Sequence, residues 1–211
     1  MIKENYQKIL TSLKKDTKLI AVSKGQDIDK IMALYEEGQR DFGENFLQEL
    51  IFKSQNLPKD INWHFLGNIQ SNKAVEIALY SNLIQSVSRK KILDILARSK
   101  VKKVNILLQL KLGNESTKSG FNAEEIKSVL KNKEDYKNIN FKGLMAIAEN
   151  IKNEDQLRIQ FQTAFHLYSS INKNKSNFNI LSMGMTSDFM YALDEGSNMI
   201  RVGTKIFGAR A

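Results

Sequence analysis

One lysine stands where a buried strand is expected to end. Residues 19–24 read LIAVSK, so a run of apolar residues suited to the core of a sheet precedes Lys24. Lysine is rarely buried without a partner, and a lysine amine condenses with carbonyl compounds to form a Schiff base. Two interpretations follow. Either the strand reaches solvent at this point, or Lys24 is a reactive amine held on a rigid scaffold.

A second group of residues is suited to binding a phosphate. Residues 182–188 read SMGMTSD and residues 201–204 read RVGT, and each stretch follows a short apolar run. The first offers a glycine, hydroxyl groups and the free N–H groups of a helix expected to begin near Ser187. The second offers Gly203, which lets a ligand approach the backbone, and the hydroxyl and N–H of Thr204. Either loop alone is a weak signal, but together they predict a phosphate site.

The lysine and the two loops together indicate a phosphorylated aldehyde held as a Schiff base, and pyridoxal phosphate is the leading candidate. Arg201 would then be the partner of the pyridine nitrogen. Because a guanidinium is effectively always charged, it would donate a hydrogen bond and leave that nitrogen unprotonated. The alternative for Arg201 is a salt bridge to a carboxylate such as Glu44 or Asp188.

Short apolar runs alternate with stretches typical of helices along the whole chain. We expect strands at residues 19–24, 41–44, 62–67, 83–87, 104–112, 141–147, 179–184 and 199–203. Helices are expected between them, with N-caps at Asp27, Ser71, Ser88, Asn122 and Ser187, and the longest at 153–171. About eight such units predict a closed (β/α)8 barrel that occupies residues 1–211 as a single domain, with an open doubly wound sheet as the alternative. In a barrel, functional groups lie at the C-terminal ends of the strands, where Lys24 is expected.

The composition argues against several classes of protein. The chain has 211 residues, no cysteine and two histidines, which excludes disulfides and argues against a structural zinc site. The net charge is +9, but the lysines are scattered and form no basic stripe with interleaved aromatic residues, so we expect no specific nucleic-acid partner. No apolar run approaches the ~18 residues of a membrane span, and the N-terminus does not resemble a signal peptide. We therefore expect a cytoplasmic protein that does not enter the membrane.

The stretches that carry this chemistry also carry a family resemblance. They are AVSK at 21–24, FGEN at 42–45, WHFLG at 63–67, QSNK at 70–73, GLM at 143–145, LSMGM at 181–185 and RVGTKIFGAR at 201–210. In this order the chain resembles the pyridoxal-phosphate homeostasis proteins. Their fold is the barrel domain of alanine racemase, the fold type III of pyridoxal-phosphate proteins, without its second domain.

The resemblance implies a role for each residue of the site. Lys24 forms the Schiff base with pyridoxal 5′-phosphate, and Arg201 lies beside the ring nitrogen. The phosphate is placed at Thr186, Gly203 and Thr204, with Ser182, Met183 and Gly184 nearby and Asn45 close to the cofactor. Two positions depart from the family pattern. Serine is more usual than threonine at 186, and a threonine- or proline-bearing segment is more usual than Gly25-Gln26 after the lysine, so the loop there is expected to differ.

The resemblance further implies a part in intracellular pyridoxal phosphate and vitamin B6 homeostasis rather than catalysis. A racemase needs two acid/base groups on opposite faces of its substrate. In the alanine racemases a tyrosine from a second domain of the partner subunit opposes the lysine. We expect no such domain here, and the tyrosines fall in expected helices or beside them.

We therefore expect a monomeric carrier whose cofactor goes to pyridoxal-phosphate-dependent apoenzymes. Two alternatives stay open. One is a small pyridoxal-phosphate enzyme acting on amino acids, which would use Lys24 with water or His64. The other is a barrel that binds phosphate without a Schiff base. We interpret His64 as a hydrogen-bonded structural residue and Lys73 as a residue that shapes the rim or binds an anion.

Overall fold

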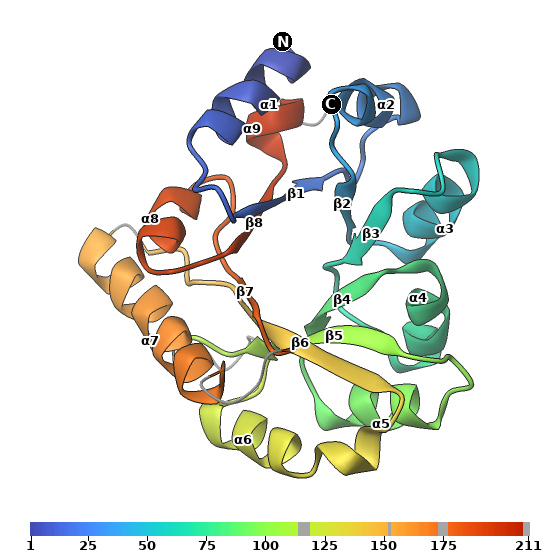
Figure 1. The fold of residues 1–211 in the computed structure, drawn as a ribbon, viewed down its shortest axis with the longest axis vertical. Coiled ribbons are helices and arrows are strands. Elements are labelled where there is room, and N and C mark those ends of the chain that lie inside the picture. The colour runs from blue at the N-terminus through green and yellow to red at the C-terminus, as the bar shows by residue number, and fades with distance from the viewer. Residues whose placement is uncertain (114–118, 152, 173–176, 209–211) are drawn as a thin grey trace.

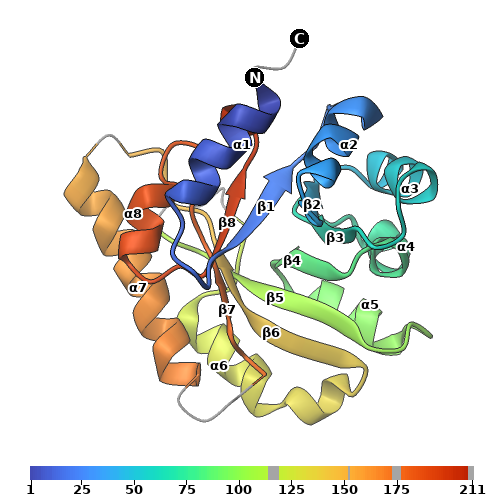
Figure 2. The same cartoon turned by 45° about the horizontal axis from the view of Figure 1, so that its top comes forward.

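The computed structural model describes residues 1–113, 119–151, 153–172 and 177–208. In this part of the chain parallel strands pair in sequence order, and β8 pairs with β1 to close a barrel (Figures 1 and 2). The strands are β1 Lys18–Val22, β2 Asp41–Glu44, β3 Asn62–Phe65, β4 Leu83–Val87, β5 Val104–Leu110, β6 Ile139–Ala146, β7 Ile180–Ser182 and β8 Met199–Val202. The predicted (β/α)8 barrel is confirmed. The last two residues of the closing family motif, Ala209 and Arg210, lie outside the described residues.

Helices cover the outside of the barrel (Figure 1). They are α1 Ile2–Thr11, α2 Ile28–Glu36, α3 Leu47–Asn56, α4 Ala74–Tyr80, α5 Lys90–Arg98, α6 Ala123–Lys131, α7 Glu154–Asn172, α8 Phe189–Asp194 and α9 Thr204–Phe207, with short 3-10 turns at Ser71–Lys73 and Lys133–Tyr136. The first and last helices lie side by side, and Asn5 Nδ2 donates to the carbonyl of Ile206 at 3.3 Å. None of the described helices is both long and apolar enough to cross a membrane.

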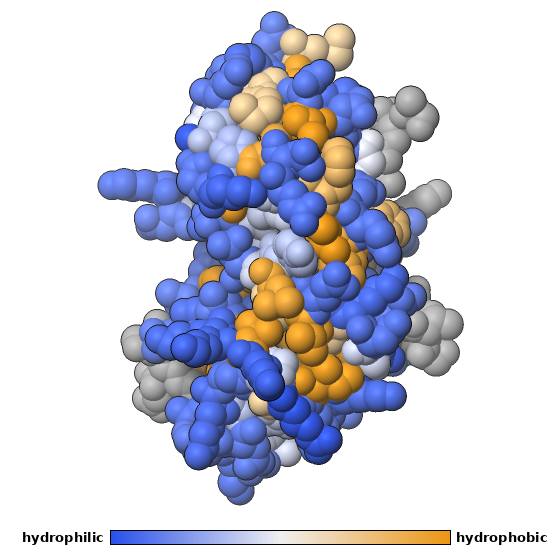
Figure 3. Space-filling view, turned by 90° about the vertical axis from the view of Figure 1, so that its right-hand side faces the viewer, coloured by the Kyte–Doolittle hydropathy of each residue, from blue (hydrophilic) through white to orange (hydrophobic). Residues whose placement is uncertain are grey.

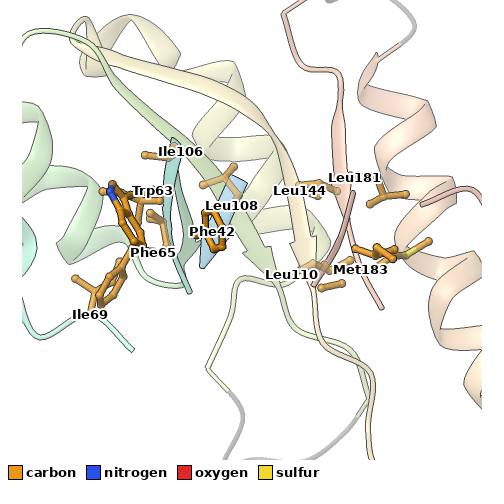
Figure 4. Close-up of a cluster of buried hydrophobic side chains, with 14 of the residues drawn as sticks. Phe42, Trp63, Phe65, Ile69, Ile106, Leu108, Leu110, Leu144, Leu181 and Met183 are labelled. Atoms are coloured by element: carbon orange, nitrogen blue, oxygen red, sulfur yellow. The ribbon is translucent and has the colours of Figure 1, made fainter. Parts of the chain in front are cut away.

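The strands read as continuous apolar runs because both surfaces of the barrel wall are covered. Side chains alternate between the two surfaces along a strand. On β1, Leu19 and Ala21 belong to the large outer core between the wall and the helices, whereas Ile20 packs inside the barrel with residues such as Leu107 and Met145. Figure 4 shows part of the outer core, with aromatic rings from β2 and β3 packed together. The interior therefore forms a second, smaller core below the site.

Some helix starts differ from the prediction by one residue or more. The capping box of Asn122 and Glu125 is confirmed, since each side chain bonds the backbone N–H of the other. Ser88 and Ser187 are not the N-caps. Helix α5 is preceded by Arg89, whose guanidinium is held by the carbonyl of Ile69 at 2.9 Å.

Helix α8 is preceded by Asp188, which makes a tight turn by accepting from Met185 N at 2.5 Å. Ser71 begins a 3-10 turn ahead of α4 instead of capping it, and Asp27 occupies the N-cap position of α2 without a side-chain capping bond. Cap positions are the least sharply specified part of a helix pattern.

One outer face carries apolar side chains among polar ones. Figure 3 views the side of the molecule formed by α2 to α5, where apolar groups appear in several places between charged ones. In this part of the chain Phe46, Phe52 and Leu79 are each more than half exposed. Isolated exposed apolar residues are ordinary on protein surfaces.

Candidate cofactor-binding site

A cavity of about 430 Å³ opens at the C-terminal ends of the strands, which is within the size range of small-molecule sites. Six of the predicted residues line it: Lys24, Asn45, Thr186, Arg201, Gly203 and Thr204. Asn45 directly follows β2, and a Cβ at Gly67 would lie 1.9 Å from its carbonyl oxygen. The glycine of the WHFLG motif therefore lets the backbone at Asn45 take its place beside the cavity.

Lys24 lies in a tight turn that directly follows β1. The strand ends at Val22, and Gln26 N donates to the carbonyl of Ser23 at 3.0 Å, which closes a turn around Lys24 and Gly25. Gly25 has a φ of +67°, in the left-handed region that residues other than glycine seldom adopt. The glycine that departs from the family pattern is therefore required by the turn that presents the lysine.

A buried ion cluster holds the backbone on both sides of Lys24. The Lys53 ammonium, from α3, lies 2.8 Å from the carbonyl oxygen of the residue before Lys24. It also lies 2.8 Å from Glu44 Oε1 and 2.7 Å from Glu49 Oε2. The Glu49 carboxylate in turn accepts from the N–H of the residue after Lys24, at 2.8 Å. One ammonium group thus connects the turn, the end of β2 and α3.

Glu44 titrates near neutral pH within this cluster. Its Oε1 accepts from the Ser23 hydroxyl at 2.6 Å, while its buried Oε2 has no hydrogen-bond partner among the described residues. Burial raises the pKa of Glu44 to about 7, although the Lys53 ammonium favours the charged form. Glu44 therefore holds its proton to a higher pH than an ordinary carboxyl, whereas the pKa of Glu49 is lowered and Glu49 is the charged partner of Lys53.

Hydroxyl and backbone donors converge on the opposite side of the cavity. Gly203 N donates to Thr186 Oγ1 at 3.3 Å, and the Thr204 hydroxyl lies 3.4 Å from the same oxygen. A Cβ at Gly203 would come within 3.2 Å of the Val22 carbonyl oxygen. The glycine thus keeps the backbone close to β1 and open to the cavity. This set of donors, with the first turn of α9, suits an anion such as a phosphate.

Arg201 forms the floor between these two sides. It is almost fully buried, and its Nη1 donates to Ser182 Oγ at 2.6 Å while Nη2 donates to the carbonyl of Ala146 at 2.9 Å. Burial lowers the pKa of Arg201 to about 10, and the nearby Asp188 opposes this, so the guanidinium stays charged at neutral pH. Neither Glu44 nor Asp188 forms a salt bridge with it among the described residues, so the ion-pair alternative for Arg201 is not realised.

Ser182, Met183 and Gly184 lie beneath the cavity rather than in its lining. Met183 packs in the outer core, and Ser182 contacts Arg201 inside the barrel. Gly184 has a φ of +93°, and a Cβ there would meet Phe189 Cα at 2.8 Å. Its carbonyl accepts from the N–H of Arg201 at 3.0 Å. These residues support Arg201 and the start of α8.

The donors in the cavity fit the predicted cofactor. Pyridoxal phosphate needs an amine for its aldehyde, donors for its phosphate and a partner for its pyridine nitrogen. The cavity provides all three: the amine of Lys24, the hydroxyl groups of Thr186 and Thr204, and the guanidinium of the buried Arg201. A side chain at Gly203 would be crowded against β1 at the point where the phosphate donors meet.

The sequence analysis assigns no role to two polar residues that have a structural part in the site. One is Lys53, whose spacing of four from Glu49 is visible in the sequence. Gln85 lies in the apolar strand LIQSV, and it is fully buried against Ser182 and His64. A polar residue inside a buried run was the available signal.

Comparison with known proteins places these features in a family. The profile of the family described as "Alanine racemase, N-terminal domain" matches residues 1–211. A protein of Haemophilus influenzae named pyridoxal phosphate homeostasis protein is 36% identical over 97% of this chain and 92% of its own length. A Synechocystis protein with the same name is 38% identical over 97% of this chain and 97% of its own length.

Solved structures share the same architecture. PipY of Synechococcus elongatus with pyridoxal phosphate bound has a TM-score of 0.88 and 31% identity, covering 99% of this chain and all of that chain. The same protein without the cofactor has a TM-score of 0.92. Alanine racemase from E. faecalis has a TM-score of 0.79 at 17% identity, over 99% of this chain but 57% of the racemase, which is a likeness of fold alone.

Proposed function

We propose that this protein binds pyridoxal 5′-phosphate and takes part in the homeostasis of this cofactor. The chain belongs to the alanine racemase N-terminal domain family and, within it, to the pyridoxal phosphate homeostasis proteins. The observation that carries the proposal is the convergence of Lys24, the phosphate donors and Arg201 on one cavity. Pyridoxal phosphate bound to the related PipY supports it.

Each residue has a defined part in holding the cofactor. The bound cofactor supplies an aldehyde, with which a lysine amine condenses with loss of water. Lys24 supplies that amine, and the turn that carries it is held by the hydrogen bond from Lys53 to the Ser23 carbonyl. Thr186, Gly203 and Thr204 bind the phosphate, and Arg201 donates to the pyridine nitrogen and leaves it unprotonated. Asn45 contacts the cofactor from the end of β2.

A carrier role suits these residues better than catalysis on amino acids. Among the described residues that line the cavity, the titratable side chains are Lys24 and Arg201. The described tyrosines lie on helices or in a 3-10 turn and do not line the cavity. Racemisation needs a second acid/base group that faces the lysine across the substrate. In this proposal the protein passes its bound cofactor to pyridoxal-phosphate-dependent apoenzymes in the cell and does not itself convert a substrate.

The amine, the phosphate donors and the arginine that we assign to the site converge on one cavity of this barrel. On this basis the protein acts as a monomer with one domain. Sedimentation at several concentrations in the presence and absence of the cofactor checks this part of the proposal. A dimer, with or without the cofactor, would contradict it.

Two measurements test the function. Titration with pyridoxal phosphate and with pyridoxal, followed by visible absorbance, should reveal binding that depends strongly on the phosphate. Equal affinity for the two compounds would contradict the phosphate site. The loaded protein is then incubated with L-alanine in deuterated water. Retained configuration is expected, whereas rapid formation of D-alanine that is lost in Lys24→Ala would make the protein a racemase.

A further inference from the structure

A continuous chain of hydrogen bonds crosses the interior of the barrel from the floor of the cavity to the opposite end. It begins at Arg201 Nη1, which donates to Ser182 Oγ at 2.6 Å, and that hydroxyl donates to Gln85 Oε1 at 2.6 Å. Gln85 Nε2 lies 3.0 Å from His64 Nδ1, and His64 Nε2 lies 2.9 Å from Asp41 Oδ1. The chain joins β8, β7, β4, β3 and β2 in turn. Its first four side chains are buried.

The amide of Gln85 gives this chain a single direction. Its Nε2 faces two acceptors, the Nδ1 of His64 and the sulfur of Met199 at 3.3 Å. A thioether has no proton to donate, so an inverted amide would place oxygen against sulfur and lose that contact. Gln85 Oε1 is therefore an acceptor. As a result, the Ser182 hydroxyl donates its proton to Gln85 and offers a lone pair to Arg201.

The same direction defines the protonation of His64. Because the amide donates to Nδ1, the imidazole is neutral and its Nε2 proton is donated to the Asp41 carboxylate. Burial lowers the pKa of His64, and the hydrogen bond to Asp41 opposes this. The Lys18 ammonium, 3.2 Å from Asp41 Oδ1, also favours the neutral ring. The other charged residues that line this end of the barrel are Asp16 and Lys142.

We propose that Gln85 and His64 are positioning residues for Arg201. This inference rests on the proposed function, in which Arg201 faces the pyridine nitrogen of the cofactor. A hydroxyl turned to accept at Ser182 anchors one nitrogen of the guanidinium, and the Ala146 carbonyl anchors another. The remaining N–H groups are then held toward the cavity. If the amide of Gln85 were inverted, Ser182 Oγ would have to accept from both Gln85 and Arg201, and its own buried proton would lose its acceptor, which would weaken this anchor of Arg201.

The first test uses the protein without cofactor. The chain has two histidines, His64 and His166, and His166 is exposed on α7. In protein labelled with ¹⁵N at histidine, the NMR signals that disappear in His166→Gln belong to His166, and those that remain belong to His64. His64 should be the neutral Nε2–H form and should not titrate between about pH 6 and 8, because burial lowers its pKa. Gln85→Glu places a carboxylate beside Nδ1 and should protonate His64. A His64 that titrates within this pH range, or that carries its proton on Nδ1, would overturn the hydrogen-bonded chain.

The guanidinium of Arg201 reports on the second step in the same apoprotein. Its N–H protons should exchange slowly with solvent in the wild type and faster in Gln85→Met, which keeps the length of the side chain but cannot accept from Ser182. Unchanged exchange in a folded Gln85→Met protein would show that Gln85 does not position Arg201. His166→Gln is the matched control and should leave these signals unaltered.

The last test uses pyridoxal phosphate and its deaza analogue, in which a CH group replaces the pyridine nitrogen. If Gln85 acts through Arg201 on that nitrogen, Gln85→Met should weaken binding of pyridoxal phosphate by about three- to tenfold and leave the analogue unaffected. Equal weakening of both would indicate a merely structural role and overturn the proposal. A wild type that binds neither compound would refute the proposed function, while the measurements on the apoprotein would still decide whether Gln85 and His64 position Arg201.

Discussion

The two sides of the cavity are held in place by different kinds of interaction. On the side of β1 and β2, the ammonium of Lys53 and two carboxylates fix the turn that carries Lys24. On the side of β7 and β8, hydroxyl groups, a glycine backbone and an amide hold Thr186 and Arg201, with the guanidinium as the one buried charge among these groups.

This difference predicts different responses to substitution. Removing one partner of a buried ion cluster leaves charge behind without compensation, and that is costly to the folded state. Removing one neutral donor from a group of several leaves the others in place. The ion cluster on the side of β1 and β2 should therefore contribute mainly to stability, while the hydroxyl groups on the side of β7 and β8 should contribute mainly to the affinity for the cofactor.

The largest effect is expected for Lys53→Met. This change leaves Glu44 and Glu49 buried or half-buried without their cation, and should lower the free energy of unfolding by roughly 3–5 kcal/mol. Urea unfolding measures it. Lys127→Met is the matched control, because the Lys127 ammonium pairs with Glu124 on the exposed surface of α6, and it should change stability by less than about 0.5 kcal/mol. Similar stabilities of the two variants would contradict the contrast between the two sides.

The next effect concerns pH. The pKa of Glu44 is raised in the folded protein from 4.5 to about 7, so its favourable contribution is present below pH 4.5 and is lost as the pH rises through 7. Glu44→Gln removes this dependence. Relative to the variant, the wild type should lose roughly 3 kcal/mol of stability between these limits.

Thermal unfolding of the wild type and of Glu44→Gln at several pH values gives this difference directly. The comparison cancels the contributions of the other titrating groups, including Asp41, whose pKa is lowered by the contact with His64 despite burial. Parallel curves for the two proteins across this range would show that Glu44 does not titrate near neutrality.

A smaller effect on stability and a clear effect on binding are expected for the threonines. Thr186→Ala and Thr204→Ala each remove one hydroxyl that we propose binds the charged phosphate, and such a hydrogen bond is worth roughly 1.5–3 kcal/mol. Because the backbone donors at Gly203 remain, binding of the cofactor should be weakened but not abolished. Titration with pyridoxal phosphate measures the loss, and pyridoxal is the control ligand, whose affinity should change little. Destabilisation of either variant as large as that of Lys53→Met would contradict the contrast.

The parts of the site that could be predicted are those set by position along a strand. The strands appear as apolar runs because parallel strands are covered on both surfaces, and the barrel brings their C-terminal ends together, so Lys24, Thr186 and Gly203 could be assigned to one site. The turn around Lys24 depends on Gly25, which the sequence presents only as a departure from a family pattern.

The residues that could not be predicted depend on packing between elements. Lys53 follows Leu50 by three positions and lies on the buried face of α3. Its spacing does not identify Glu44 and the Ser23 carbonyl as its partners, because both lie on other elements. Gln85 and His64 lie on neighbouring strands, and their contact follows from the pairing of β3 with β4 and its register. Polar residues within apolar strands signal that partners exist, but they do not identify those partners.

The central claim is that Lys24 is the amine that holds the cofactor. Protein loaded with pyridoxal phosphate is reduced with borohydride, which makes a lysine linkage permanent, and the labelled peptide is identified by mass spectrometry. We expect one label per chain, on Lys24. We also expect none in Lys24→Ala, which should remain folded, while Lys73→Ala should retain the label. A label on Lys73 or another lysine, or an equally labelled Lys24→Ala protein, would contradict the account.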